Sequence, residues 1–74
     1  MKILVTGASG RIGRALVVRL ARQHQVQGLD QAPSSTAHWL GDLGDAALLR
    51  RALQGVDAVV HAAALHAPQI GRVP

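Results

Sequence analysis

The stretch Thr6-Gly7-Ala8-Ser9-Gly10-Arg11-Ile12-Gly13 lies between an apolar run, Ile3 to Val5, and an amphipathic stretch that extends to Leu20. Its three glycines are spaced three residues apart, where a buried strand has to turn sharply into a helix. Such a turn directs the first backbone N–H groups of the helix, and the positive end of its dipole, toward an anion above the turn. In a dinucleotide site this anion is the pyrophosphate, so the stretch predicts both the place and the class of a ligand.

Each glycine has a separate predicted role. Gly7 permits the tight turn, Gly10 lets the pyrophosphate approach the backbone, and Gly13 lets the helix pack close to the sheet. A glycine pattern alone is weak evidence, but here a strand precedes it and a helix follows it, as a dinucleotide turn requires. Further contacts with the anion are expected from the N–H groups of Arg11 and Ile12 and from the hydroxyl of Ser9.

The pattern of apolar residues predicts six elements in the order β-α-β-β-α-β. Helical periodicity follows the glycine turn, and Asp45 is a good N-cap for a second helix that Gly55 ends. The expected strands are Lys2 to Thr6, Gln25 to Leu29 with its end at Asp30, Ala37 to Leu40, and Asp57 to Ala63; the first helix is expected from Arg11 until it fades near Gln23 and His24.

Parallel strands joined by right-handed crossovers give a partial Rossmann (doubly wound) α/β fold. The expected sheet order is 3-2-1-4, with one helix on each face. The fourth strand then has no neighbour on its outer side, and an unpaired edge of this kind invites self-association. Residues 1–74 are therefore expected to form a single domain that is part of a larger one.

A carboxylate at the end of the second strand predicts the choice of cofactor. Asp30 follows Gly13 by 17 residues, where an acid accepts hydrogen bonds from both hydroxyls of the adenosine ribose. A 2′-phosphate in their place would bring like charges to about 4 Å, a repulsion of about 4 kcal/mol at an effective dielectric of about 20. Asp30 thus favours NAD over NADP. A solvated turn aspartate is the alternative, and Arg11 beside the phosphate site is a mild signal for NADP.

Two further segments fit the same site. Asp42 and Leu43 follow the third strand, where Asp42 can accept from the adenine amino group and Leu43 can pack on the ring; the alternative for Asp42 is a simple turn former. At the end of the fourth strand, small residues let the chain pass beneath the cofactor, although core packing explains them almost as well. These residues belong to the run His61-Ala62-Ala63-Ala64.

Taken together, the glycine turn, Asp30, the pair Asp42-Leu43 and the run from Asp57 to Ala64 resemble the extended short-chain dehydrogenase/reductase family, the NAD-dependent sugar epimerases and dehydratases. The likeness covers essentially the whole chain, as the amino-terminal cofactor-binding portion of that family. The resemblance implies diphosphate contacts from Gly7, Gly10, Arg11 and Ile12, ribose contacts from Asp30, adenine contacts from Asp42 and Leu43, a nicotinamide-side ribose lined by Ala62, Ala63 and Ala64, and a position near the cofactor for His66.

The chain departs from that family in its catalytic residues. Members carry a Tyr-x-x-x-Lys pair for proton transfer, whereas this chain has no tyrosine and a single lysine, Lys2. No catalytic residue is therefore assigned. The resemblance implies the cofactor half of an epimerase- or dehydratase-like oxidoreductase acting on a nucleotide sugar or related alcohol. Two alternatives stay open: a non-catalytic dinucleotide-binding module or redox sensor, and an atypical NADPH or flavin reductase.

Composition narrows the remaining classes. The formal charge of +4 comes from arginines on two separate helix faces with no aromatic residues between them, which argues against nucleic-acid binding. Cysteine is absent, which excludes disulfides and cysteine-based metal sites, and no metal site is expected. No apolar run has the length of a signal sequence or membrane span. We expect a cytoplasmic protein that contacts a small-molecule substrate only together with the rest of the enzyme.

Overall fold

The first strand forms the buried centre of the sheet because its residues are apolar and mostly β-branched, which suits a strand covered on both faces. The computed structural model describes residues 1–62. In it β1 (Lys2–Thr6) has Leu4 and Val5 fully buried. The glycine turn leads from β1 directly into α1 (Arg11–Leu20).

The sheet has the order that the sequence predicts. The strands β2 (Gln25–Asp30), β3 (Trp39–Leu40) and β4 (Ala58–His61) join β1 in the order β3-β2-β1-β4, and each neighbouring pair is parallel. In the register, Val5 lies between Gly28 of β2 and Val60 of β4. The prediction of a partial doubly wound fold is confirmed. β4 lies at the edge of the described sheet, and self-association through that edge stays a prediction.

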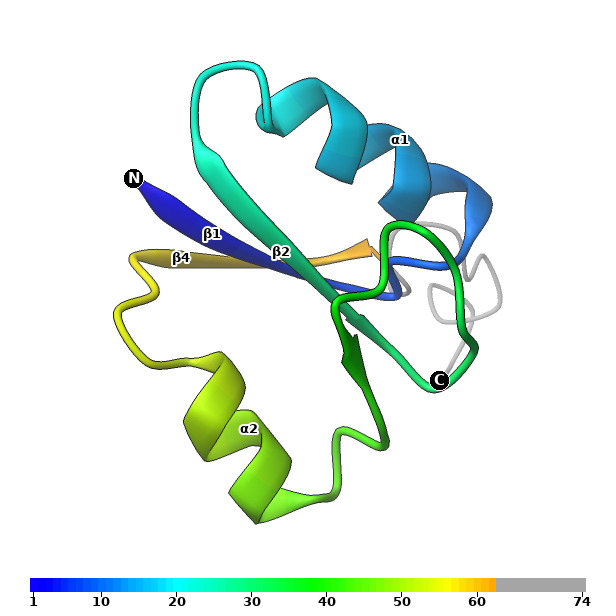
Figure 1. The fold of residues 1–74 in the computed structure, drawn as a ribbon, viewed down its shortest axis with the longest axis vertical. Helices are drawn as coiled ribbons and strands as arrows, with labels where there is room; N and C mark the ends of the chain where they lie inside the picture. The colour runs from blue at the N-terminus through cyan, green and yellow to red at the C-terminus, as the bar shows by residue number, and fades with distance from the viewer. Residues whose placement is uncertain (63–74) are drawn as a thin grey trace, which may run out of the picture.

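The two helices cover opposite faces of the sheet, as Figure 1 shows for α1 and for α2 (Ala46–Ala52). Successive side chains of a strand point to opposite faces, so β1 supplies two separate cores. The core beneath α1 contains Ile3, Val5, Ala8, Val17 and Ala62. The core beneath α2 contains Leu4, Leu29, Leu48 and Ala52.

The ends of four elements differ from the prediction. α1 ends at Leu20 rather than near Gln23 and His24, and the Gln23 N–H bonds to the Leu20 carbonyl in a turn. β3 begins at Trp39 rather than Ala37, because the imidazole Nδ1 of His38 accepts the Gly28 N–H, at 2.8 Å, that a strand partner would otherwise accept. α2 ends at Ala52, three residues before the left-handed Gly55. β4 runs only from Ala58 to His61, and Asp57 instead accepts a hydrogen bond from the Lys2 N–H through its side chain. Ala63, the predicted end of that strand, lies outside the described residues.

The N-cap of α2 is confirmed. Asp45 Oδ1 accepts a hydrogen bond from the Leu48 N–H at 3.1 Å, and the buried Leu48 in turn packs on the sheet. This bond satisfies one of the N–H groups that the first turn of a helix leaves without an intrahelical acceptor.

We expect Asp45→Ala to lower the free energy of unfolding by about 1 kcal/mol, because it removes the cap from a helix of only seven residues. Asp45→Asn is the matched control, since asparagine caps about as well as aspartate. Urea unfolding of the full-length protein measures both variants. Equal midpoints for Asp45→Ala and the wild type would contradict this role of the cap.

Candidate functional site

The turn after β1 adopts the conformation that its first glycine allows. Gly7 has φ of 73°, in the left-handed region that favours glycine. Its N–H donates to the Leu29 carbonyl of β2 at 3.0 Å, and its own carbonyl accepts from the Gly10 N–H at 3.1 Å. The chain therefore reverses sharply at the carboxyl end of β1, next to the end of β2.

The third glycine brings α1 onto this turn. A Cβ atom added at Gly13 would lie 2.0 Å from the Gly7 carbonyl oxygen and 2.9 Å from the Ala8 Cα atom. Real Cβ contacts essentially never fall below 3.0 Å. Only glycine at this position lets the first turn of α1 pack directly on the backbone of the glycine turn.

The N-terminus of α1 has no side-chain cap among residues 1–62. Gly10 is the N-cap residue, and the first turn carries no acidic residue. The N–H groups of Arg11, Ile12 and Gly13 have no acceptor within the helix, because the first turn lacks one. Together with the helix dipole they make this end of α1 attractive to an anion.

The carboxylate of Asp30 is held in place by backbone amides. Oδ2 accepts from the Ser9 N–H and Oδ1 from the Ala32 N–H, each at 3.0 Å. Burial acts to raise the pKa of Asp30, but the hydrogen bonds from the N–H groups of Ala32, Ser9 and Gln31 outweigh it and hold the pKa below its ordinary value of 3.8. The side chain is thus ionised at neutral pH. A carboxylate has roughly four lone-pair sites, so these bonds do not use up its capacity to accept from a ligand.

A small cavity collects four of the predicted site residues. Its volume is about 220 Å³. Gly7, Asp30, Asp42 and Leu43 line it together with Leu29, Gln31 and Gly41. Pockets for drug-sized ligands measure about 300–1,000 Å³, so this cavity matches one end of a dinucleotide rather than the whole molecule.

Asp42 lines the cavity and also shapes its own turn. Its Oδ1 atom accepts from the Gly44 N–H at 2.9 Å, and its carbonyl accepts from the Asp45 N–H at 3.0 Å. One carboxylate oxygen of Asp42 therefore stabilises the turn, as the turn-forming alternative expects. The adenine contact stays a prediction. Leu43 is 44% exposed, which leaves its side chain accessible to a flat ligand.

Two predicted contact residues have other partners in the structure. The Ser9 hydroxyl bonds to the Ala32 carbonyl and lies 2.9 Å from the Ser34 hydroxyl, so it faces loop 31–38 rather than the open end of α1. Ala62 is fully buried in the core beneath α1, as the packing alternative expects. Their contacts with a cofactor stay predictions. Ala63, Ala64 and His66 lie outside the described residues.

Two residues that shape the site, Thr36 and Gly28, were not among the residues predicted from the sequence. Thr36 is buried and donates from Oγ1 to the Ala8 carbonyl at 2.7 Å, tying loop 31–38 to the glycine turn. Gly28 makes room for this loop, because a Cβ atom there would lie 2.0 Å from the Thr36 carbonyl oxygen. A glycine inside a strand often marks a site where another segment of backbone approaches closely. Gly28 could therefore have indicated this contact from the sequence.

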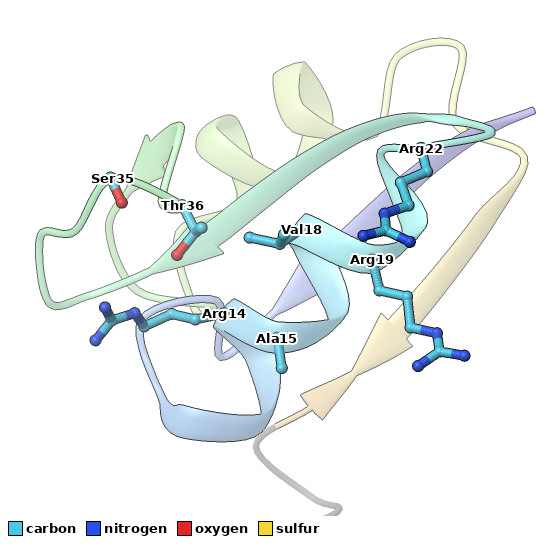
Figure 2. Close-up of a pocket in the computed structure, with 7 residues that line it drawn as sticks. All are labelled: Arg14, Ala15, Val18, Arg19, Arg22, Ser35 and Thr36. Carbon is cyan, nitrogen blue, oxygen red and sulfur yellow. The ribbon is translucent and has the colours of Figure 1, made fainter.

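A second hollow of about 510 Å³ lies on the outer face of α1, apart from the predicted cofactor residues. Figure 2 shows Arg14, Arg19 and Arg22 around Ala15 and the 62% exposed Val18. Ser35 and Thr36 close one end of the hollow. Loop 31–38 thus adjoins the glycine turn on one side and Arg14 on the other.

Residues 1–62 contain no group of three or more metal-ligating side chains that could hold an ion. Within the same part of the chain, neither helix has both the length and the apolar character needed to cross a bilayer.

We expect Gly13→Ala to lower the free energy of unfolding by about 3 kcal/mol or more, because the added methyl group overlaps the Gly7 carbonyl. Gly44→Ala is the matched control, since its Cβ atom would meet nothing closer than 3.6 Å, and its stability should stay within about 1 kcal/mol of wild type. Urea unfolding compares the two. Similar stabilities would disprove the close packing of α1 on the turn.

The lowered pKa of Asp30 predicts a pH dependence. A carboxylate with a depressed pKa in the folded state stabilises the protein above the unfolded pKa, and this contribution is lost as the pH falls through the folded value. The wild type should therefore exceed Asp30→Asn in stability at about pH 7, and the difference should shrink below about pH 4. Urea unfolding across this range measures it. A difference that stays constant down to about pH 2.5 would refute the amide-held carboxylate.

Comparison with known proteins finds relatives that match most of this chain. An uncharacterized protein of Mycobacterium tuberculosis is 44% identical over 69 residues, which is 85% of this chain and 8% of the relative. The 3 beta-hydroxysteroid dehydrogenase/Delta 5-->4-isomerase of the same species is 39% identical over 71 residues, or 86% of this chain and 19% of that enzyme. This chain therefore spans less than a fifth of the length of these two relatives.

A solved structure shares the fold and much of the sequence. It is a short-chain dehydrogenase/reductase superfamily protein of Agrobacterium tumefaciens with bound NAD, 45% identical, with a TM-score of 0.73 over 82% of this chain and 20% of that one. The profile of one protein family matches residues 3–71, nearly the whole sequence. The chain belongs to the NAD dependent epimerase/dehydratase family.

Proposed function

We propose that this chain is the NAD-binding portion of an oxidoreductase of the epimerase/dehydratase family. The observation that carries the proposal is the cavity that brings Asp30, Asp42 and Leu43 together with Gly7, which begins the turn into α1. The NAD bound to the Agrobacterium protein, which is 45% identical to this chain, supports the choice of ligand.

Different residues of the chain bind different parts of the dinucleotide. In this proposal the N–H groups of Arg11 and Ile12 bind the diphosphate, because the first turn of α1 leaves them without an acceptor. The ionised Asp30 accepts from the adenosine ribose hydroxyls, and Asp42 and Leu43 hold the adenine at the mouth of the cavity. The small cavity volume suits the adenosine end, so the nicotinamide end extends toward the carboxyl end of β4.

The chain binds and orients the cofactor, and the acid–base groups come from elsewhere in the protein. When bound, NAD would supply the hydride acceptor for oxidation of a substrate hydroxyl. The chain has no tyrosine, and its one lysine, Lys2, donates from Nζ to the Gln54 carbonyl at the opposite end of β1 from the glycine turn. A nucleotide sugar or related alcohol is our proposed substrate class, by resemblance to the family.

We expect the full-length protein to bind NAD more tightly than NADP. Asp30→Ala should lower the ratio of the NADP to the NAD dissociation constant about tenfold or more. The reason is that the wild-type carboxylate binds two ribose hydroxyls but repels a 2′-phosphate. Isothermal titration calorimetry with each cofactor at one fixed salt concentration measures the two dissociation constants.

The exposed Gln31 provides a matched control, because it also lines the cavity but carries no charge. Gln31→Ala should keep the preference for NAD. A wild type that binds neither cofactor would refute the proposed function. Equal affinities for NAD and NADP in the wild type would refute the role of Asp30 alone.

A further inference from the structure

We infer that Ser34 and Thr36 are specificity-determining positioning residues, which hold loop 31–38 on the glycine turn and so keep Asp30 oriented to accept a 2′-hydroxyl rather than a 2′-phosphate. The inference rests on the proposed function. It concerns three hydroxyls, those of Ser9, Ser34 and Thr36, which we call the hydroxyl bridge.

The orientation of Asp30 depends on two segments at once. One carboxylate oxygen is held by the Ser9 N–H of the glycine turn, and the other by the Ala32 N–H of loop 31–38, each at 3.0 Å. If these segments moved apart, the carboxylate would lose one of these two hydrogen bonds. Interactions that hold loop 31–38 on the glycine turn therefore also hold the Asp30 carboxylate in its orientation.

The hydroxyl bridge joins the same two segments. Ser9 Oγ bonds to the Ala32 carbonyl and lies 2.9 Å from Ser34 Oγ, which lies 3.1 Å from Thr36 Oγ1. Thr36 Oγ1 donates to the Ala8 carbonyl at 2.7 Å, and the Thr36 N–H donates to Ser34 Oγ at 3.2 Å. The bridge begins and ends on the glycine turn and passes through the loop.

The protons of the bridge assign the central position to Ser34. A carbonyl oxygen can only accept, so Ser9 spends its single hydroxyl proton on Ala32 and Thr36 spends its own on Ala8. The single Ser34 proton can then be donated to either Ser9 Oγ or Thr36 Oγ1, but not to both at once. Replacement of Ser34 thus removes its contact with Ser9 and the acceptor of the Thr36 N–H, while the bonds from Ser9 to Ala32 and from Thr36 to Ala8 remain.

The loop also has no room to shift toward the sheet. Thr36 is only 8% exposed, and the position of a Cβ atom on Gly28 would be 2.0 Å from its carbonyl oxygen. The backbone of the loop therefore rests directly on β2. The hydroxyl bridge in turn opposes movement of the loop away from the glycine turn.

Movement of the loop away from the turn is one way to make room for a 2′-phosphate. The phosphate is larger than a hydroxyl and negatively charged, so Asp30 has to turn away or loop 31–38 has to withdraw before it fits. Arg14 lines the hollow on the other side of Thr36 and provides a positive charge beside a withdrawn loop. Loosening the bridge should therefore harm NAD binding more than NADP binding.

The test uses the full-length protein and calorimetric titration with NAD and NADP separately. Ser34→Ala and Thr36→Val should each weaken NAD binding about fivefold, the effect of about one hydrogen bond. They should also narrow the ratio of the NADP to the NAD dissociation constant at least about threefold. Thr36→Ser keeps the hydroxyl, so its NAD affinity and its ratio of dissociation constants should match those of the wild type.

Ser35→Ala is the matched control, since Ser35 is exposed in the same loop and makes no hydrogen bond through its side chain to residues 1–62. It should change neither constant. An unchanged ratio in Ser34→Ala, with or without weaker NAD binding, would overturn the inference and leave the proposed function intact. A wild type that binds neither cofactor would overturn both. If Thr36→Val does not fold, Ser34→Ala decides the outcome.

Discussion

The close contact between α1 and the glycine turn is the constraint on which the site depends. With 2.0 Å between a notional Gly13 Cβ atom and the Gly7 carbonyl oxygen, any side chain there would force the helix away from the turn. Without that contact the amides of Arg11 and Ile12 would no longer point over the end of β1. The positive end of the helix and the carboxylate of Asp30 would then no longer lie at one edge of the sheet.

The strand order and the faces of the helices were predictable because their causes are local. Alternation along β1 and helical periodicity after Arg11 depend on neighbours in sequence, and right-handed crossovers leave few topologies for parallel strands. The glycine turn was predictable for the same reason, since strand, turn and helix follow one another directly. Asp45 was recognisable as a cap because it acts on Leu48, three residues away.

The parts that the sequence did not predict depend on contacts between distant segments. Thr36 bonds to Ala8, which lies 28 residues earlier, and nothing in a serine- and threonine-containing loop indicates that partner. β3 is short because the His38 imidazole replaces a backbone acceptor for Gly28. The direction of the Ser9 hydroxyl likewise follows from where loop 31–38 folds back. Side-chain hydrogen bonds between segments that are distant in sequence could thus not be predicted from sequence patterns.

The central claim is that main-chain amides of α1 hold the diphosphate while Asp30 holds the adenosine ribose. A crystal structure of the full-length protein with NAD tests it most directly. We predict diphosphate oxygens within hydrogen-bond distance of the Arg11 and Ile12 N–H groups, and both ribose hydroxyls on the Asp30 carboxylate. NAD bound away from the N-terminus of α1, or a ribose that does not touch Asp30, would contradict the account.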